Sequence, residues 1–323
     1  MNDFTIAAEA AEMRLDRFLR REIPGLTQGV LQKLLRNGKI KLNGAKADAN
    51  ARLAEGDLLR VPEIAPPVAM PKERHIVKMD PARIKELEAM IIYRDDAVIA
   101  LNKPAGLAVQ GGSGITVHVD GMLDALREGE DGERPKLVHR LDRDTSGILL
   151  LARSSQAARK LSTLFRSRNV EKIYWALLTA VPETPQGRVD LPLKRVEFGN
   201  TSRSEPTGRK DPDGQSAVTE YRVLDSAGKK FCLAELRPQT GRMHQLRAHT
   251  LALGTPILGD AAYGGIFAEG FADQLHLHAR KLVVPHPDGG MLTLEAELPK
   301  HMHDSMKYLG FSVPDAGKCV RRT

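Results

Sequence analysis

Hydrophobic residues near the N-terminus follow two different periods. Apolar side chains recur at helical spacing over 15–19 and again over 30–35, which predicts two helices. Asn37-Gly38 is typical of a helix end. Lysines then alternate with apolar residues over 39–42, and Asn43-Gly44 predicts a tight turn. The pattern therefore indicates a small unit of two helices followed by short strands.

A proline-rich stretch separates this unit from the rest of the chain. Residues 64–74 contain three prolines and show no periodicity, which is typical of a linker. Residues 75–90 are expected to continue the linker and to include a short helix. We therefore predict an N-terminal module at 1–63, a linker at 64–90 and a larger domain at 91–323.

The larger domain is rich in predicted strands. Gly147–Arg153 is a short apolar run that indicates a buried strand, and Ser154 is a suitable N-cap for a helix from Gln156 to about Arg168. The polar stretch Lys194–Gly214 is expected to form a long loop. Further elements are a helix over 241–253 and strands within 91–104, 173–180, 216–224, 231–238, 275–284 and 291–299. The predicted class is α+β: a small α/β module, then a domain with a large mixed, mostly antiparallel sheet flanked by helices.

Composition narrows the class of protein. The chain has 323 residues, 41% hydrophobic and 28% charged, which suits two soluble globular domains. No apolar run approaches the ~20 residues that span a bilayer, and the N-terminus lacks the pattern of a secretory signal. The two cysteines, Cys232 and Cys319, have neither metal nor redox spacing. We therefore expect a cytoplasmic protein without disulfide bonds or a membrane partner.

The formal net charge is +7, which is compatible with a polyanionic partner. The distribution of charge is more informative than its sum, because the segment 28–46 carries five basic residues and no acidic one. A helix and turn with charge of one sign suit a phosphate backbone, although an ordinary solvated helix face would look the same. The basic residues are Lys33, Arg36, Lys39, Lys41 and Lys46.

The densest polar cluster lies at 139–147, where His-Arg-Leu-Asp-Arg-Asp-Thr-Ser-Gly precedes the predicted buried strand. A polar turn against a buried strand is a frequent place for functional side chains, and local ion pairs are the alternative explanation. Asp142 and Asp144 could also hold Mg²⁺, but the adjacent arginines favour ion-paired carboxylates.

Two further segments carry candidate chemistry. On the helix predicted at 241–253, Arg247 could meet a carboxylate from another segment, and an aspartate paired with arginine keeps a low pKa, as a nucleophile requires. In the strand predicted at 173–180, Tyr174 and Trp175 point to opposite faces. An exposed tyrosine near a basic loop can stack on a base, although core packing is the commoner role of a strand aromatic.

Other chemistries find less support. His276 and His278, like His301 and His303, have H-x-H spacing, but neither a Cys pair nor HExxH accompanies them. The glycine-rich stretch at 111–114 is not a Walker loop, and no GxSxG elbow is present. We therefore expect neither a metal nor a small-molecule cofactor.

Three motifs resemble the RluA-type family of RNA pseudouridine synthases in order and spacing. They are HRLDRDTSGILLLAR at His139–Arg153, EKIYWAL at Glu171–Leu177, and TGRMHQLRAH followed by GTPILGDAAYG. The resemblance covers about Ile91 to Pro299. The N-terminal unit, with RLDRFL, a basic helix and GKIKLNG, resembles the alpha-L RNA-binding module that often precedes this catalytic domain. QGGSG at Gln110–Gly114 is most similar to the large-subunit ribosomal RNA members, of the C type.

The resemblance implies roles for individual residues. Asp142 matches the catalytic aspartate, and Arg140 matches the arginine that helps to displace the target base from its stack. Tyr174 matches the tyrosine that stacks on the uracil, Arg247 the basic residue that pairs with the aspartate, and Leu277 the apolar residue on the other face of the base.

The same resemblance implies further RNA contacts. In the catalytic domain they are Arg143, Arg242 and His244. In the N-terminal module they are Lys33, Arg36, Lys39 and Lys41. One departure from the family pattern is Met243, where threonine or serine is usual. We expect this change to adjust the surroundings of the site without loss of activity.

The implied activity is the isomerisation of specific uridines to pseudouridine, most similar to that on large-subunit (23S) ribosomal RNA. The target base must be flipped out of its stack, which costs about a few kcal/mol. Whether Asp142 attacks C1′ or C6 or accepts a proton stays open. The alternatives are a transfer RNA enzyme, a catalytically silent RNA-binding or ribosome-assembly protein, and a metal-dependent nuclease. The expected partner is ribosomal RNA, and the expected state is a monomer.

Overall fold

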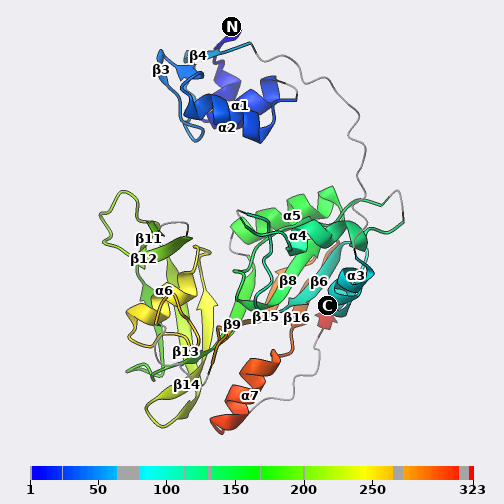
Figure 1. The fold of residues 1–323 in the computed structure, drawn as a ribbon, viewed down its shortest axis with the longest axis vertical. Coiled ribbons are helices and arrows are strands. Elements are labelled where there is room, and N and C mark those ends of the chain that lie inside the picture. The colour runs from blue at the N-terminus through cyan, green and yellow to red at the C-terminus, as the bar shows by residue number, and fades with distance from the viewer. Residues whose placement is uncertain are drawn as a thin grey trace. The chain divides into compact units, whose positions relative to one another are not determined.

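The computed structural model divides the chain into two compact units, Met1–Val77 and Lys78–Thr323 (Figure 1). Each unit is described by itself. The structure describes residues 2–23, 25–63, 80–112, 114–129, 132–167, 169–198, 201–264, 272–312 and 320–323. The predicted linker segment 64–74 lies outside these residues. None of the helices in the described ranges is long and apolar enough to cross a membrane.

The first unit packs two helices on a small antiparallel sheet. Its elements are β1 (Asn2–Thr5), a 3₁₀ turn (Ala8–Ala10), α1 (Leu15–Glu22), α2 (Gln28–Arg36), β2 (Lys41–Leu42), β3 (Ala45–Lys46) and β4 (Leu58–Val61). The sheet has the strand order β1-β4-β2-β3. The apolar faces of both helices form the core, which includes Leu15, Phe18, Leu19, Leu31 and Leu35.

The hairpin of this unit turns at the predicted dipeptide. Asn43 and Gly44 both have positive φ angles, 51° and 84°, which this tight turn requires. The side chain of Asn43 accepts a hydrogen bond from the Leu58 N–H (2.8 Å) and donates one to Asp57 (2.8 Å). The turn is thereby tied to β4, and the basic segment that surrounds it stays exposed.

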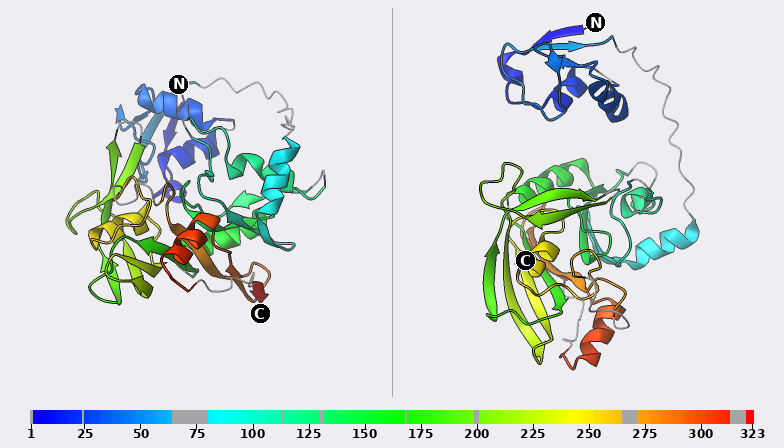
Figure 2. Two further views of the ribbon diagram at one scale, coloured as in Figure 1. Left: turned by 60° about the horizontal axis from the view of Figure 1, so that its bottom comes forward. Right: turned by 60° about the vertical axis from the view of Figure 1, so that its left-hand side comes forward.

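The second unit is built on a large mixed sheet. Its strands are β5 (Ile91–Arg94), β6 (Val98–Lys103), β7 (Lys136–Leu137), β8 (Ser146–Ala152), β9 (Glu171–Leu178), β10 (Gln186–Asp190), β13 (Val218–Ala227), β14 (Phe231–Pro238), β15 (Leu277–Pro285), β16 (Met291–Glu295) and β17 (Val320–Arg322). The main order is β10-β13-β14-β9-β15-β8-β6-β5, with β7 beside β8, β16 beside β15 and β17 beside β16. Among these pairs only β15 and β8 run parallel. Figure 2 shows the long strands β13 and β14 side by side near one end of the sheet.

Helices cover both faces of this sheet, in agreement with the predicted class. They are α3 (Pro81–Ala89), α4 (Val119–Met122) with the 3₁₀ turn Leu123–Leu126, α5 (Ser155–Arg166), α6 (Gln245–Ala252) and α7 (Lys300–Tyr308). Alternate residues of β8 enter two different cores: Ile148 and Leu150 pack with α5, while Leu149 and Leu151 pack with α3 and α4. Burial on both faces explains why β8 is a continuous apolar run.

Three predictions about secondary structure need correction. Residues 80–90 were expected in the linker, but α3 packs on the second unit through the fully buried Leu87. The stretch 194–214 is not simply a loop, because β11 (Leu193–Phe198) and β12 (Thr201–Pro206) form an antiparallel hairpin. The helix expected from 241 begins only at Gln245, because His244 has a left-handed backbone (φ 49°, ψ 24°).

Candidate active site

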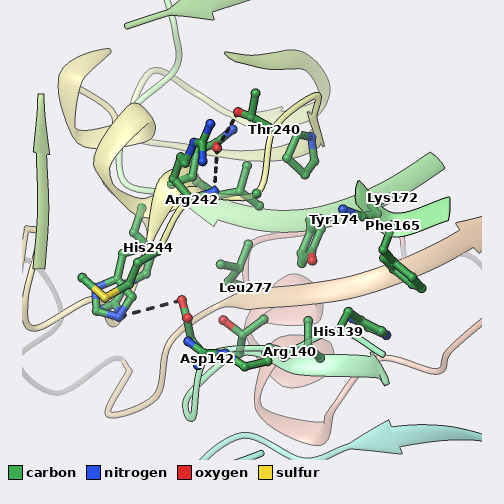
Figure 3. A pocket seen from close by; sticks show the side chains of 18 of the residues that line it. His139, Arg140, Asp142, Phe165, Lys172, Tyr174, Thr240, Arg242, His244 and Leu277 are labelled. Atoms are coloured by element: carbon green, nitrogen blue, oxygen red, sulfur yellow. Dashed lines mark hydrogen bonds and ion pairs between the residues drawn. The ribbon is translucent and has the colours of Figure 1, made fainter. Parts of the chain in front are cut away.

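A cavity of about 540 Å³ opens in the second unit beside the polar turn before β8, which forms part of its wall (Figure 3). Its wall combines that turn with the end of α5, strands β9 and β15, and the segment 238–247. The structure brings most of the predicted site residues together here. Those that line the cavity are Arg140, Asp142, Tyr174, Arg242, His244, Arg247 and Leu277.

The turn that carries Asp142 is fixed by its own backbone and by the strand that follows. The carbonyl of Asp142 accepts the Thr145 N–H at 3.2 Å, and the Leu141 side chain is buried beneath the turn. Gly147 has a φ of 108°, and a Cβ there would lie 2.4 Å from the Ala279 carbonyl oxygen. Only glycine therefore permits this close approach of β8 to β15.

Lys103 supports the same turn from inside the protein. Its fully buried side chain donates hydrogen bonds to the carbonyls of Pro104 (2.9 Å), Leu107 (2.8 Å) and Arg143 (2.9 Å). Burial lowers the pKa of Lys103 to about 7, against the opposing charges of Asp144 and Asp142. The ammonium thus joins the loop after β6 to the turn that presents Asp142.

Tyr174 and Leu277 lie on neighbouring strands and on the same face of the sheet. In the pairing of β9 with β15, Leu277 stands opposite Ala176, two residues along the strand from Tyr174. Such diagonal neighbours are roughly 7–8 Å apart, which leaves room for one planar ring between them. Burial, together with the charge of Asp142, raises the pKa of Tyr174, so the phenol stays protonated.

Arg247 pairs with Asp260. The prediction that its partner is Asp142 is therefore corrected. Two hydrogen bonds join the guanidinium of Arg247 to the Asp260 carboxylate, at 2.7 and 2.6 Å. Burial acts to lower the pKa of Arg247, but hydrogen bonding and charge from Asp260, with a further contribution from Asp142, raise it. Arg247 is therefore a fixed positive charge that interacts electrostatically with Asp142.

His244 lies beside Asp142. Its Nε2 lies 4.0 Å from Asp142 Oδ2 (Figure 3). Its Nδ1 is 3.2 Å from the hydroxyl of Tyr263. Burial lowers the pKa of His244, and the charge of Asp142 opposes this effect. The left-handed backbone of His244 turns its ring toward Asp142 at the start of α6.

Gln245 orders the turn that leads to His244. Its side-chain oxygen accepts hydrogen bonds from the Thr240 hydroxyl (2.7 Å) and the Arg242 N–H (3.1 Å). Its amide nitrogen donates to the Val218 carbonyl at 2.9 Å. Since Gln245 is buried, these bonds fix the backbone that presents both Arg242 and His244 to the cavity.

Several residues at the site have no role in the sequence-based prediction. Asp260 and Tyr263 belong to the GDAAYG motif, so its presence in the sequence was the available signal. Phe165 and Lys172 also line the cavity; Lys172 lies in the EKIYWAL motif without an assigned role, and no pattern in the sequence pointed to Phe165. Their approach depends on the packing of α5 against the sheet, which is a long-range feature.

The remaining predicted RNA contacts lie outside this cavity. Arg143 is exposed, and its guanidinium pairs with Asp144 (Nε to Oδ1, 3.0 Å). The cations of the first unit are also exposed: Lys33, Arg36, Lys39 and Lys41. Within the described part of the chain, no three His, Cys, Asp or Glu side chains converge as metal ligands would.

The fold and motifs belong to known families. Residues 97–252 match the family described as RNA pseudouridylate synthase, and residues 13–59 match the S4 domain. The chain is 40% identical over 293 residues to ribosomal large subunit pseudouridine synthase C of Rickettsia bellii, which covers 90% of this chain and 96% of that protein. The chain belongs to the RNA pseudouridylate synthase family, a family of isomerases.

Two further similarities agree with this assignment. The protein of the same name from Vibrio parahaemolyticus is 35% identical over 290 residues, which is 87% of this chain and 88% of that one. Among solved structures, human RNA pseudouridylate synthase domain containing 4 aligns with a TM-score of 0.63 and 31% identity, over 72% of this chain and 98% of that chain. The resemblance drawn from the motifs is therefore confirmed, both for the catalytic domain and for the N-terminal RNA-binding module.

Proposed function

We propose that this chain converts specific uridines of large-subunit (23S) ribosomal RNA to pseudouridine and that Asp142 is its essential residue. The observation that carries the proposal is the composition of the cavity. Asp142 is the only carboxylate among the described residues that line it, and it stands among aromatic, apolar and cationic side chains. The similarity to ribosomal large subunit pseudouridine synthase C proteins supports this choice of RNA.

The reaction rearranges bonds within one nucleotide. The bond between N1 and C1′ breaks, a bond between C5 and C1′ forms, one proton leaves C5, and N1 gains one. Asp142 has a partly exposed carboxylate at the cavity wall, where it can act on the sugar or on the base. Arg247, which Asp260 holds in place, and His244, with its Nε2 4.0 Å from Asp142 Oδ2, are the basic side chains that lie near this carboxylate.

The remaining residues suit capture of a flipped base. Tyr174 and Leu277 are spaced to hold a planar ring between them, and base stacking contributes about 1–3 kcal/mol. That amount offsets much of the unstacking cost. Arg140 is exposed beside Asp142, and its one side-chain hydrogen bond within the described ranges is a long one to Gln110 (3.5 Å), so its guanidinium can enter the space that the base leaves.

The proposal extends to the whole chain. The exposed lysines and arginines of the S4 domain would bind RNA phosphates while the second unit carries out the chemistry. Ribosomal RNA is the one partner that this scheme requires. We therefore propose a monomer that acts in the cytoplasm without a small-molecule cofactor.

Tritium release from [5-³H]uridine-labelled RNA tests the proposal, because each conversion frees the hydrogen at C5. Wild type, Asp142→Asn and Asp144→Asn would be incubated with large-subunit RNA and, in parallel, with transfer RNA. Asp144→Asn is a matched control, since it makes the same change two residues away at a side chain outside the cavity. We expect release from large-subunit RNA by wild type and Asp144→Asn but not by Asp142→Asn.

Each other outcome contradicts a defined part of the proposal. Release from transfer RNA alone would replace the substrate, and full release by Asp142→Asn would remove the role of that residue. Absence of release from both RNAs, with tight binding retained, would indicate an RNA-binding protein on the same fold.

A further inference from the structure

A layered group of three side chains forms the end of the cavity away from Asp142. Figure 3 shows Phe165 between Lys172 and His139. The Lys172 ammonium lies 5.4 Å from the centre of the Phe165 ring, and the rings of Phe165 and His139 stack at 4.5 Å with an angle of 14° between their planes. All three residues line the cavity.

This group carries one positive charge, on Lys172. Burial and the charge of Lys172 together lower the pKa of His139 to about 3, and His139 Nε2 accepts the Leu150 N–H at 2.8 Å. The imidazole is therefore neutral. Its stacked position fixes Phe165, whose ring in turn supports the ammonium by a cation–π contact.

The Lys172 ammonium has no carboxylate within 4.0 Å in the part of the chain that the structure describes. The adjacent Glu171 points to the other side of β9 and pairs with Arg237 at 2.8 Å. Burial lowers the pKa of Lys172, which reflects the cost of removing its charge from water. A partly desolvated cation without a counter-ion is unfavourable unless a ligand supplies the negative charge.

We propose that Lys172 binds the phosphodiester group next to the target uridine and so forms a second subsite of the cavity. The inference rests on the proposed function, because it places the uracil beside Tyr174. Lys172 and Tyr174 are two residues apart on β9, so their side chains share a face at a separation of roughly 7 Å. That separation is comparable with the span of one nucleotide. Arg166, also at this end, is exposed, and among the described residues its guanidinium donates to the Thr163 hydroxyl at 3.3 Å, so it can contact the same RNA strand.

The test compares Lys172→Met with Lys172→Arg and with Lys230→Met in the full-length protein. Lys230 is an exposed lysine in the turn between β13 and β14, so its replacement removes the same charge away from the cavity. Affinity for a labelled, uridine-containing single-stranded RNA of about 12 nucleotides would be measured by fluorescence anisotropy at several salt concentrations.

We expect Lys172→Met to weaken binding by about 10- to 100-fold, the usual range for a lost charged hydrogen bond. The slope of log K against log salt should become shallower by about 0.7, the value for one phosphate contact on a single strand. Lys172→Arg should restore most of the affinity, and Lys230→Met should behave as wild type. Thermal unfolding of Lys172→Met at or above the wild-type temperature would separate this effect from misfolding.

Turnover on large-subunit RNA gives a second, independent readout. Loss of a ground-state phosphate contact should raise KM and leave kcat near the wild-type value. An unchanged affinity and salt slope would overturn the inference, as would a fall in kcat at constant KM. If wild type turned over neither large-subunit RNA nor transfer RNA, the proposed function would fail. The binding measurement would still decide the role of Lys172.

Discussion

The guanidinium of Arg247 and the carboxylate of Asp260 form a buried ion pair with two hydrogen bonds. The carboxylate also accepts the N–H groups of Ala262 and Tyr263, both at 3.1 Å, so Oδ1 accepts three hydrogen bonds and Oδ2 accepts one. The ring of Tyr263 lies 4.9 Å from the guanidinium carbon. The side chains of the pair are 9% and 0% exposed, so Arg247 is held rigidly and cannot swing to Asp142 without leaving a buried charge unpaired.

Replacement of Asp260 by alanine should therefore destabilise the protein strongly. The Arg247 charge would remain buried without its partner, and loss of one member of such a pair reduces the free energy of unfolding by about 3–5 kcal/mol. Urea denaturation followed by circular dichroism measures this difference.

The exposed pair Lys300–Asp304 gives the control, because Asp304→Ala should barely change the urea midpoint. The double variant Arg247→Met/Asp260→Leu should recover part of the stability, since neither charge is then left alone. Equal stability of the double variant and Asp260→Ala would contradict this explanation.

Tyr174 should tolerate loss of its hydroxyl better than loss of its ring. Tyr174→Phe keeps the surface that faces Leu277, whereas Tyr174→Ala removes a stacking contribution of about 1–3 kcal/mol and leaves a void between two core clusters. We expect a fall in kcat/KM of about 10- to 100-fold or more for the alanine variant and a smaller fall for phenylalanine. Equal losses in tritium-release assays would argue against a stacking role.

Local signals in the sequence were sufficient for much of the fold. The Ser154 side chain accepts the Ala157 N–H at 3.1 Å, so the predicted cap begins α5 as expected. The apolar run at 147–152 is the doubly buried strand β8, and Asn43-Gly44 turns the first hairpin. Each of these features depends on residues within a few positions of one another, which a single sequence can reveal.

The features of the site that were not predicted depend on contacts between residues far apart in the sequence. The partner of Arg247 comes from a loop thirteen residues later, and the αL backbone of His244 depends on the hydrogen bonds that Gln245 makes to distant strands. The hairpin β11–β12 has few apolar residues, yet the Tyr263 hydroxyl accepts the Ser204 N–H (2.8 Å) and anchors it. None of these contacts has a local periodicity that would predict it.

Acid should destabilise the protein through histidines whose pKa is lowered in the folded chain, and the half-buried His139 provides a test at the site. Burial lowers its pKa to about 3 in the folded chain, against an ordinary value of 6.5. Between these two pH values the unfolded chain binds a proton that the folded chain does not. The free energy of unfolding therefore falls as the pH drops below 6.5, by about 1.4 kcal/mol per pH unit for this residue.

His139→Gln keeps an acceptor for the Leu150 N–H but cannot take up the proton. Between pH 6.5 and 5 the variant should lose about 2 kcal/mol less stability than wild type, as measured by urea denaturation at each pH. His303→Gln makes the same change at an exposed histidine and serves as the matched control. An unaltered pH dependence in His139→Gln would show that His139 is not buried as a neutral ring.

The first unit should contribute affinity through charge and leave the chemistry unchanged. A variant with glutamine at four exposed cations around α2 and β2 would lose up to four phosphate contacts. The slope of log K against log salt should therefore become shallower by about 3. The four positions are Lys33, Arg36, Lys39 and Lys41. Because they lie in a different unit from Asp142, kcat at saturating RNA should stay at the wild-type value.

The matched control removes the same net charge from exposed lysines of the second unit, by glutamine at Lys85, Lys229, Lys230 and Lys307. If charge acted only through the overall field of the protein, both variants would weaken binding equally. A change of slope confined to the first variant instead requires direct phosphate contacts by the S4 domain. Equal slopes in wild type and both variants would show that the basic segment is an ordinary solvated face, the alternative that its composition alone allows.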